Sequence, residues 1–352
     1  MRFHPTDEQL QIQDALRGTL ADTLPPAALH RLVDGDAELD VESWQALMAL
    51  GVGGLMLPEA AGGAALSLVD AVLAVEVLGA GAVSGPVVPH LMAGLAVAAS
   101  ADPALRERWL PGLASGETIA TIAFGGAWVP ESWDVAIADG RVTGAVQFVQ
   151  AAGAAALFLV GVAGGGLALV EPGEGVRIEP LASEDRSRRL SRVVFDGAPA
   201  TPLAIDSGRV FDAGLVLIAA DALGGAQRAT DMTVAYAKDR EQFGQPIGRF
   251  QALKHQLATM ALEVEPARAL VWYAAYAWDR ALPDAQRSAA IAKAHLADRF
   301  TSVARAAVAA HGGIGYTWEY DLSIWVRRAF FDRAFLGGPS VHRARAVALA
   351  GW

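Results

Sequence analysis

The chain has 352 residues, 53% of them hydrophobic, which is enough for a large core and for more than one subdomain. It contains no cysteine, which excludes disulfides, thiolate metal ligands and a cysteine nucleophile, and which fits a reducing cytosol, so we expect a cytoplasmic protein. The formal net charge of −10 argues against nucleic acid as the main partner, whereas a phosphorylated ligand needs only a local group of arginines.

The first part of the chain, residues 1–116, is predicted to be a helical domain. Its start is polar and lacks the apolar core of a signal peptide. Thr6 is the expected N-cap of a first helix, in which Leu16 and Leu20 belong to an apolar stripe. A second helix is expected from about Val41, followed by a glycine-rich connection over residues 51–63.

The middle part, residues 117–203, is predicted to be a small β domain. Short runs typical of strands alternate with Gly, Pro and Asp turns, and these runs are 118–124, 141–149, 155–162, 167–170 and 192–195. The apolar run 154–170 is rich in glycine and slightly short for a membrane span. We therefore interpret it as buried strands joined by a turn at residues 164–166, and we expect no contact with a membrane.

The last part, residues 204–352, is predicted to be a helical bundle. A long apolar helix is expected over residues 211–237, and a third bundle helix over 288–310. The helix between them begins after Pro246 and carries apolar residues spaced 4, 3 and 4 positions apart, which is typical of a bundle helix. The fold class is therefore α+β, with an N-terminal helical domain, a middle β domain and a C-terminal four-helix bundle.

The stretch 236–251 is the densest in unusual chemistry. Gly244, Pro246 and Gly248 interrupt the helix that precedes them. Arg240 offers a planar fork of donors that fits phosphate oxygens in pairs, and Phe243 can lie against a flat ring. This composition indicates a loop that grips a nucleotide cofactor, but a helix–loop–helix corner with a solvated arginine explains the residues equally well.

Two motifs make the chain resemble the acyl-CoA dehydrogenase family. Residues 240–247 read Arg-Glu-Gln-Phe-Gly-Gln-Pro-Ile and are followed by Phe250-Gln251, and residues 311–320 read His-Gly-Gly-Ile-Gly-Tyr-Thr-Trp-Glu-Tyr. The resemblance implies the fold of that family and an FAD that spans a subunit interface. The flavin ring lies in one subunit's β domain, and the neighbour's bundle holds the pyrophosphate and adenosine. The residues that match the neighbour's role are Arg240, Gln242, Phe243, Ile247, Phe250, Gln251, Gly312 and Gly313.

The sequence departs from the family where the reaction takes place. Members remove the α-proton of a CoA thioester with a Glu while the β-hydrogen leaves as hydride to the flavin. The two family positions of that Glu correspond to Leu336 and Gly214, so no catalytic residue is predicted in this chain. Segment 123–133 lacks the family's flavin-binding turn, and Phe148 and Gln150 replace an aromatic-hydroxyl pair only partly. We therefore expect that this chain's β domain does not hold flavin in the family's manner.

The resemblance and its gaps together predict the degenerate subunit of a heterotetrameric acyl-CoA dehydrogenase of the steroid-degradation type. A second dehydrogenase-like subunit would supply the Glu, the substrate would be a bulky or steroid-derived acyl-CoA, and an electron-transferring flavoprotein would accept the electrons. Two alternatives stay open. One is a self-sufficient homo-oligomeric dehydrogenase whose displaced base is Asp212, Asp221 or Asp332. The other is a flavin-free structural or binding protein on the same fold.

Overall fold

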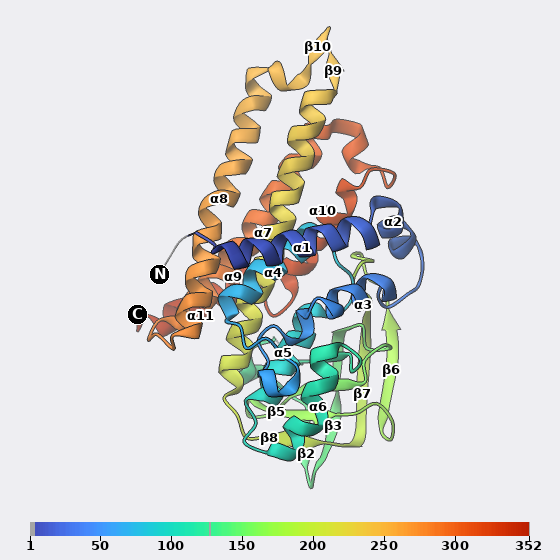
Figure 1. Ribbon diagram of the computed structural model, residues 1–352, viewed down its shortest axis with the longest axis vertical. Helices are drawn as coiled ribbons and strands as arrows, with labels where there is room; N and C mark the ends of the chain where they lie inside the picture. Colours follow the sequence, from blue (N-terminus) through green and yellow to red (C-terminus); the bar gives the residue numbers. More distant parts are fainter. Residues whose placement is uncertain (1–3, 127, 352) are drawn as a thin grey trace.

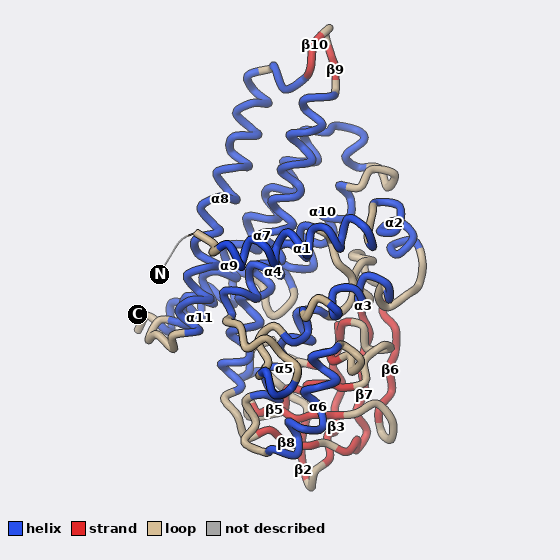
Figure 2. Tube along the Cα trace, viewed as in Figure 1, coloured by secondary structure: helices blue, strands red, loops and turns tan. Residues whose placement is uncertain are grey.

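The computed structural model describes residues 4–126 and 128–351. The molecule is elongated, with most strands gathered at one end and the turn between two long helices at the other (Figure 1). Helices make up the N-terminal and C-terminal parts, and strands make up the part between them (Figure 2). This order confirms the predicted α+β fold class. Residue 127, within the segment 123–133, lies outside the described residues.

Local signals in the sequence fix several ends of the N-terminal helices. Thr6 caps the first helix as predicted, because its hydroxyl accepts from the backbone N–H of Gln9 while the Gln9 side chain accepts from the backbone N–H of Thr6. Ser67 and Asp70 form the same reciprocal pair at the start of α4. The helices are α1 (Asp7–Thr23), α2 (Pro26–Asp34), α3 (Val41–Ala49), α4 (Leu68–Ala80), α5 (Val87–Ala98) and α6 (Pro103–Ser115), with short 3-10 turns η1 (Val52–Gly54) and η2 (Glu59–Ala61).

The middle domain consists of two four-stranded sheets. The first has the order β1-β4-β5-β8 and the second β2-β3-β7-β6, and all neighbours are antiparallel except the parallel pair β1 and β4. Buried Phe158 and Phe195 meet edge to face in the core of this domain. The strands are β1 (Ala120–Ala123), β2 (Ala136–Ala138), β3 (Arg141–Gln150), β4 (Leu157–Val162), β5 (Gly166–Val170), β6 (Val176–Leu181), β7 (Leu190–Pro199) and β8 (Thr201–Leu203), with η3 (Pro130–Ser132) between β1 and β2.

The C-terminal part is built on long packed helices. Two of them extend beyond the rest of the molecule and are joined at their far end by a small hairpin (Figure 1). The helices are α7 (Ser207–Asp239), α8 (Gln251–Asp279), α9 (Ala285–His311), α10 (Leu322–Ala334) and α11 (Pro339–Leu349). The hairpin is β9 (Glu241–Gln242) with β10 (Gln245–Pro246), and the short turns are η4 (Ile247–Arg249) and η5 (Gly312–Tyr316).

Helix α7 is the central helix of the molecule. It is long and apolar enough to cross a membrane, but 94% of its most apolar window is buried inside the protein, as in the core helix of a globular protein. It crosses α4 with almost no side chain between the two backbones. A Cβ on Gly224 would collide with the carbonyl of Glu76, and a Cβ on Gly79 with the carbonyl of Asp221. These two glycines therefore set the distance between the N-terminal domain and the bundle.

Candidate functional site

The two positions that the sequence predicts to correspond to the family's catalytic Glu lie side by side in this structure. A Cβ on Gly214 in α7 would lie 3.1 Å from Cδ1 of Leu336, which follows α10. It would also lie 2.5 Å from Sδ of Met92 in α5. Leu336 and Met92 are both fully buried. The predicted place of the carboxylate is therefore filled by packed apolar side chains.

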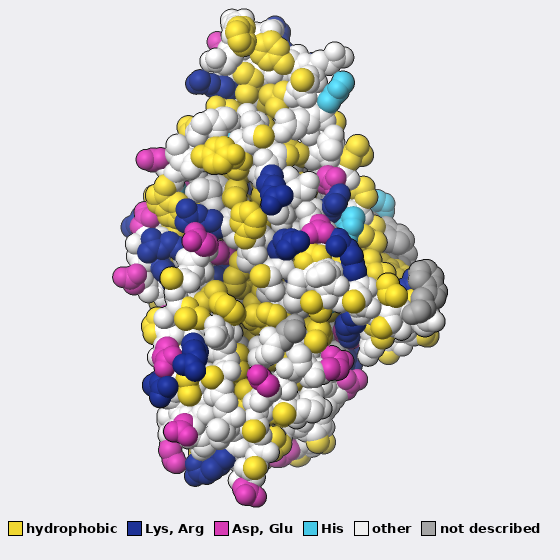
Figure 3. Space-filling view, turned by 180° about the vertical axis from the view of Figure 1, so that it is seen from behind, with side chains coloured by type: hydrophobic (Ala, Val, Ile, Leu, Met, Phe, Trp, Pro, Cys, Tyr) yellow, Lys and Arg dark blue, Asp and Glu magenta, His cyan; other side chains and the backbone are white. Residues whose placement is uncertain are grey.

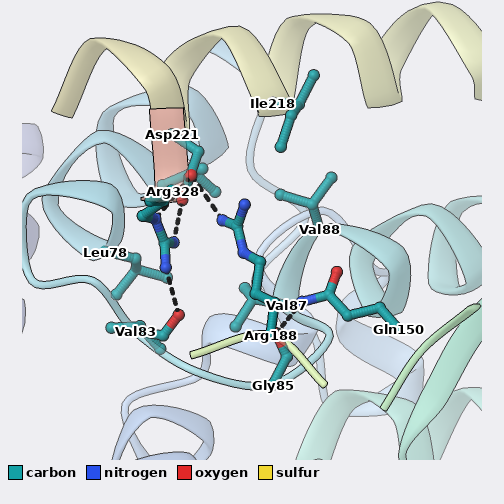
Figure 4. A pocket seen from close by; sticks show the side chains of 11 residues that line it. Leu78, Val83, Gly85, Val87, Val88, Gln150, Arg188, Ile218, Asp221 and Arg328 are labelled. Atoms are coloured by element: carbon teal, nitrogen blue, oxygen red, sulfur yellow. Dashed lines mark hydrogen bonds and ion pairs between the residues drawn. The ribbon is translucent and has the colours of Figure 1, made fainter. Parts of the chain in front are cut away.

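Beside this apolar contact lies a buried group of charges, which we name the four-charge cluster: Arg188, Asp221, Arg328 and Asp332. Arg188 donates to Asp221 at 2.6 Å and also pairs with Asp332. Arg328 donates to both oxygens of Asp221, at 2.5 and 3.1 Å, and to the carbonyl of Val83 at 2.9 Å. Figure 4 shows both arginines converging on Asp221. Each of the four side chains is at most 4% exposed, so the charges depend on one another and not on water.

The two carboxylates of the cluster have opposite pKa shifts. Burial alone would raise the pKa of Asp221, but Arg188 and Arg328 outweigh it and hold that pKa well below its usual range. Burial raises the pKa of Asp332, and the adjacent charge of Asp221 raises it further, against the effect of Arg188. Burial also lowers the pKa of nearby Lys293 to about 7, partly offset by Asp332. Asp221 is therefore the carboxylate that stays charged, and neither acid is free to accept a substrate proton.

Asp212 differs from these two acids. Burial raises the pKa of Asp212 to about 6, although its ion pair with Arg345 at 2.6 Å opposes the shift. That pKa would suit a general base. However, Asp212 lies two residues before Gly214, about 200° away around the helix, so it points away from Met92 and Leu336. It lines instead a small surface cleft with Arg209 and Trp278.

The segment that should form the flavin-binding turn packs onto itself and onto the bundle. Phe124 lies 4.4 Å from the ring of Trp133, and the Trp133 indole N–H donates to the carbonyl of Trp128 at 3.0 Å. The Trp128 ring in turn meets Phe335 at 5.1 Å. These aromatic contacts bring the β domain directly against the residue that precedes Leu336. The described part of this segment is therefore occupied by packed aromatic side chains.

Strand β3 carries Phe148 and Gln150, the two partial replacements of the family's aromatic-hydroxyl pair. Phe148 lies at an irregularity in the pairing with β7, has a left-handed φ of 62° and is 49% exposed. Gln150 is buried, and its side-chain amide already donates to the carbonyl of Gly85 at 2.7 Å. Gln150 is thus already engaged within the chain, and Phe148 has no hydrogen-bonding group in its side chain.

The predicted cofactor residues lie at the other end of the molecule. Arg240, Gln242 and Phe243 are exposed in and beside the β9–β10 hairpin, and Phe243 is 92% exposed. Phe250 meets Phe243 edge to face at 6.0 Å, and the amide of Ile247 closes the hairpin by donating to the carbonyl of Arg240 at 2.8 Å. Hydrophobic side chains gather at this end of the surface (Figure 3). An exposed arginine beside an exposed aromatic ring fits a ligand that carries both phosphate and a planar base.

The Gly312–Gly313 turn is fastened to the base of the same hairpin. His311 is buried and stacks on Tyr236 at 4.4 Å, one helical turn before Arg240. Its ring nitrogens lie 2.7 Å from the carbonyl of Ala307 and 3.1 Å from the hydroxyl of Tyr320. Both glycines are exposed and have open space around a hypothetical Cβ. The structure thus brings the two sequence motifs together at the far end of the bundle.

Sequence reasoning missed the four-charge cluster. Asp221 and Asp332 were considered only as displaced bases, and Arg188 and Arg328 were not considered at all. No local signal marks Arg188 as buried, because its partners lie on α7 and α10, far along the chain. A weak signal existed for Arg328, since it lies four residues before Asp332 on one face of α10.

Family models and solved structures match the chain along most of its length. The models of the N-terminal domain and of the C-terminal domain of acyl-CoA dehydrogenase match residues 6–117 and 207–348, together more than half of the chain. A solved variant of the Tcur3481-Tcur3483 steroid ACAD has a TM-score of 0.92 and 28% identity, with 98% of each chain covered.

Two curated relatives from Mycobacterium tuberculosis strain H37Rv differ in length. Acyl-CoA dehydrogenase FadE34 is 36% identical over 360 residues, which cover 98% of this chain but only 48% of FadE34. The chain thus spans about half the length of that relative. Acyl-CoA dehydrogenase IpdE2 is 30% identical over 340 residues, which cover 95% of both proteins.

Proposed function

Because this chain belongs to the acyl-CoA dehydrogenase family, whose members are FAD-dependent oxidoreductases acting on acyl-CoA, we propose that it is a non-catalytic subunit of a heteromeric enzyme. In this proposal the chain completes the FAD site of a partner subunit with its hairpin end. The partner, a second dehydrogenase-like subunit, supplies the flavin-ring site and the catalytic Glu.

The observation that carries the proposal is the contrast between the two ends of the molecule. The hairpin end presents Arg240, Gln242 and Phe243 to solvent, whereas the spot between Gly214 and Leu336 is closed by apolar packing. The hairpin and the β domain lie at opposite ends of the molecule (Figure 1). This separation supports a site that the hairpin completes on another subunit.

The relatives support a partner and a substrate class. The match to this chain covers about half of FadE34, so the FadE34 polypeptide has room for a second unit of similar size. The name of the similar steroid ACAD joins two proteins, Tcur3481 and Tcur3483. We extend these features to this chain and propose a heterotetramer that acts on a CoA thioester with a bulky, steroid-derived acyl group. An electron-transferring flavoprotein in the cytoplasm would receive the electrons.

Each named residue has a defined task in this proposal. FAD, when bound, supplies the acceptor for the β-hydrogen, which leaves as hydride while the partner's Glu takes the α-proton to give a 2,3-enoyl thioester. Arg240 provides paired donors for the pyrophosphate, and Phe243 and Phe250 provide apolar surface beside the nucleotide. Gln242, Ile247, Gln251, Gly312 and Gly313 complete the same surface. The glycines allow a ligand to approach the backbone closely.

The test is the visible spectrum and native mass of the chain, purified alone and after co-expression with an acyl-CoA dehydrogenase encoded beside it. We expect a colourless protein alone and a yellow, active heteromer with the partner. Robust turnover by the pure single chain would overturn the proposal. A colourless heteromer would favour the flavin-free structural protein.

One observation favours the self-sufficient dehydrogenase as a second candidate. Asp212 is a buried carboxylate whose pKa is raised to about 6, the range of a general base. A yellow, active homo-oligomer that loses turnover on Asp212→Asn, but not on Asp14→Asn at an exposed surface pair, would establish this alternative.

A further inference from the structure

Arg188 reaches the centre of the molecule from a loop of the β domain. The loop connects β6 to β7, and a tight turn holds it, in which the amide and hydroxyl of Ser187 both donate to the Asp185 carboxylate, at 3.0 and 2.6 Å. From this turn the Arg188 side chain extends inward until only 4% of it is exposed. Its guanidinium lies 4.6 Å from the centre of the Phe331 ring. The side chain thus spans from the β domain to the bundle.

Three segments that border Arg188 also carry Gly214, Met92 or Leu336, the residues at the predicted position of the catalytic Glu. On α7, Ile218 and Asp221 lie one and two turns after Gly214. On α5, Val88 lies one turn before Met92. Asp332 lies four residues before Leu336. The space in which Arg188 ends therefore lies within one to two helical turns of the position that the sequence predicts for the family's Glu.

That space is almost completely filled, and Gln150, Asp221 and Arg328 line part of it. The apolar part of its lining comes from α4, α5 and α7 and includes Val75, Leu78, Val88 and Ile218. Figure 4 shows Arg188 between Leu78 on one side and Val88 and Ile218 on the other. A free volume of about 10 Å³ remains in it, which is room for roughly one water molecule. Pockets that hold a small organic ligand measure roughly 300–1,000 Å³. The side chain of Arg188 thus occupies most of the cavity.

We propose that Arg188 acts as a built-in ligand that fills and closes the internal cavity of this chain. Its guanidinium is matched by fixed carboxylates on two helices, as a bound cation would be. A neutral acyl group in the same place would leave Asp221 with Arg328 alone and would remove the ion-pair partner of Asp332. The cavity therefore accepts a guanidinium and rejects an acyl chain. That this cavity corresponds to the acyl site rests on the proposed function, whereas its occupation by Arg188 does not.

The experiment removes the built-in ligand and returns it as a small molecule. Arg188→Ala in the full chain opens a cavity that retains Asp221 and Asp332. We expect the Tm to fall by roughly 5–10 °C, because the variant leaves buried charge without its partner. Methylguanidinium at about 10 mM should then raise the Tm of Arg188→Ala by roughly 2–4 °C, because it binds only the folded state. Wild type should show no rise.

Three controls isolate the effect of the cavity. Arg188→Met keeps the volume and removes the charge, so methylguanidinium should not stabilise it. Arg186→Ala, at a half-buried position two residues away, should lose little stability and show no rescue. Tetramethylammonium chloride at the same concentration controls for ionic strength. An unchanged Tm in Arg188→Ala, or equal effects of methylguanidinium on all variants, would overturn the proposal.

The test also covers a variant that does not fold. If Arg188→Ala is insoluble, expression and purification with methylguanidinium present should recover soluble protein, and failure to recover it would also overturn the proposal. Every readout is a melting temperature or a yield, so none depends on FAD or on dehydrogenase activity. The proposed function could therefore fail while this inference stands, and the reverse.

Discussion

Gly214 and Leu336 occupy one spot in the folded chain, with only 3.1 Å between a Cβ on the glycine and Cδ1 of the leucine. The sequence predicts that these are the two alternative positions of the family's Glu, and their proximity fits that prediction. In this chain neither position is an acid, and Met92 fills the remaining space. Restoring a carboxylate at one position would therefore bury it against apolar side chains and not against a substrate.

The first prediction concerns that restoration. We expect Leu336→Glu to yield no dehydrogenase activity in the chain alone and to destabilise the fold by roughly 3–5 kcal/mol, because the new carboxylate has no partner at a fully buried position. Denaturant unfolding measures the loss. Leu336→Met, which nearly conserves volume, should cost less than about 1.5 kcal/mol. Turnover by a stable Leu336→Glu chain would contradict the closed site.

The second prediction concerns pH. The folded protein raises the pKa of Asp212 from 3.8 to about 6, mainly through burial. At pH values between these two pKa values, the folded state keeps a proton that the unfolded chain has lost. The free energy of unfolding therefore falls as the pH rises from about 4 to about 6. The Asp212 contribution should decrease by roughly 3 kcal/mol over this range. Above pH 6 it should stay constant.

Asp212→Asn tests this sign directly. The stability difference between wild type and Asp212→Asn should shift in favour of the variant between pH 4 and 6. Asp14→Asn, at a side chain that is 76% exposed, should follow the wild-type profile. A parallel profile for wild type and Asp212→Asn would show that the carboxyl is already charged at pH 4.

The sequence predicted the parts of the fold that local patterns determine. Gly244, Pro246 and Gly248 marked the turn between two long helices, and the structure has its hairpin there. The runs that became β3, β4, β5 and β7 were also found. Helix α2 was missed because it opens with two prolines and spans only Pro26–Asp34. Strands β2 and β8 were missed because each has only three residues, and β6 was missed because it contains Pro180, which argues against a strand.

The interior of the candidate site could not be predicted in the same way. Arg188 and Arg345 look like surface residues in the sequence, and each is drawn inward by a carboxylate that is distant along the chain. In the sequence, Asp212 looks like any acid near a helix start. Its raised pKa results mainly from burial in the folded protein. Such features depend on which helices meet. That information is absent from any local window.

The third prediction concerns the crossing of α4 and α7. Gly224→Ala places a methyl group against the carbonyl of Glu76, so the two helices must separate. We expect a loss of roughly 1–3 kcal/mol or more in the free energy of unfolding. Gly18→Ala in α1 has open space and a helical backbone, so it should stabilise the protein by roughly 0.5–1 kcal/mol. Equal effects of the two changes would contradict the close crossing.

The last prediction tests the hairpin as a cofactor surface. Arg240 and Phe243 are exposed and contribute little to the core, so Arg240→Ala and Phe243→Ala should leave the Tm of the isolated chain unchanged within about 1 °C. In the heteromer, loss of a charge-assisted hydrogen bond to phosphate is worth roughly 1.5–3 kcal/mol, so Arg240→Ala should weaken FAD retention about 10- to 100-fold. The ratio of flavin absorbance to protein after dialysis measures it.

Arg249 provides the matched control for this measurement. It is exposed at the same end of the bundle but lies outside the residues that match the family's FAD contacts. Arg249→Ala should therefore keep the wild-type flavin content. If Arg240→Ala and Arg249→Ala lose flavin equally, the hairpin attracts FAD only through its overall charge. If neither loses flavin, the cofactor does not lie at this end of the chain, because an exposed arginine that grips a phosphate cannot be removed without effect.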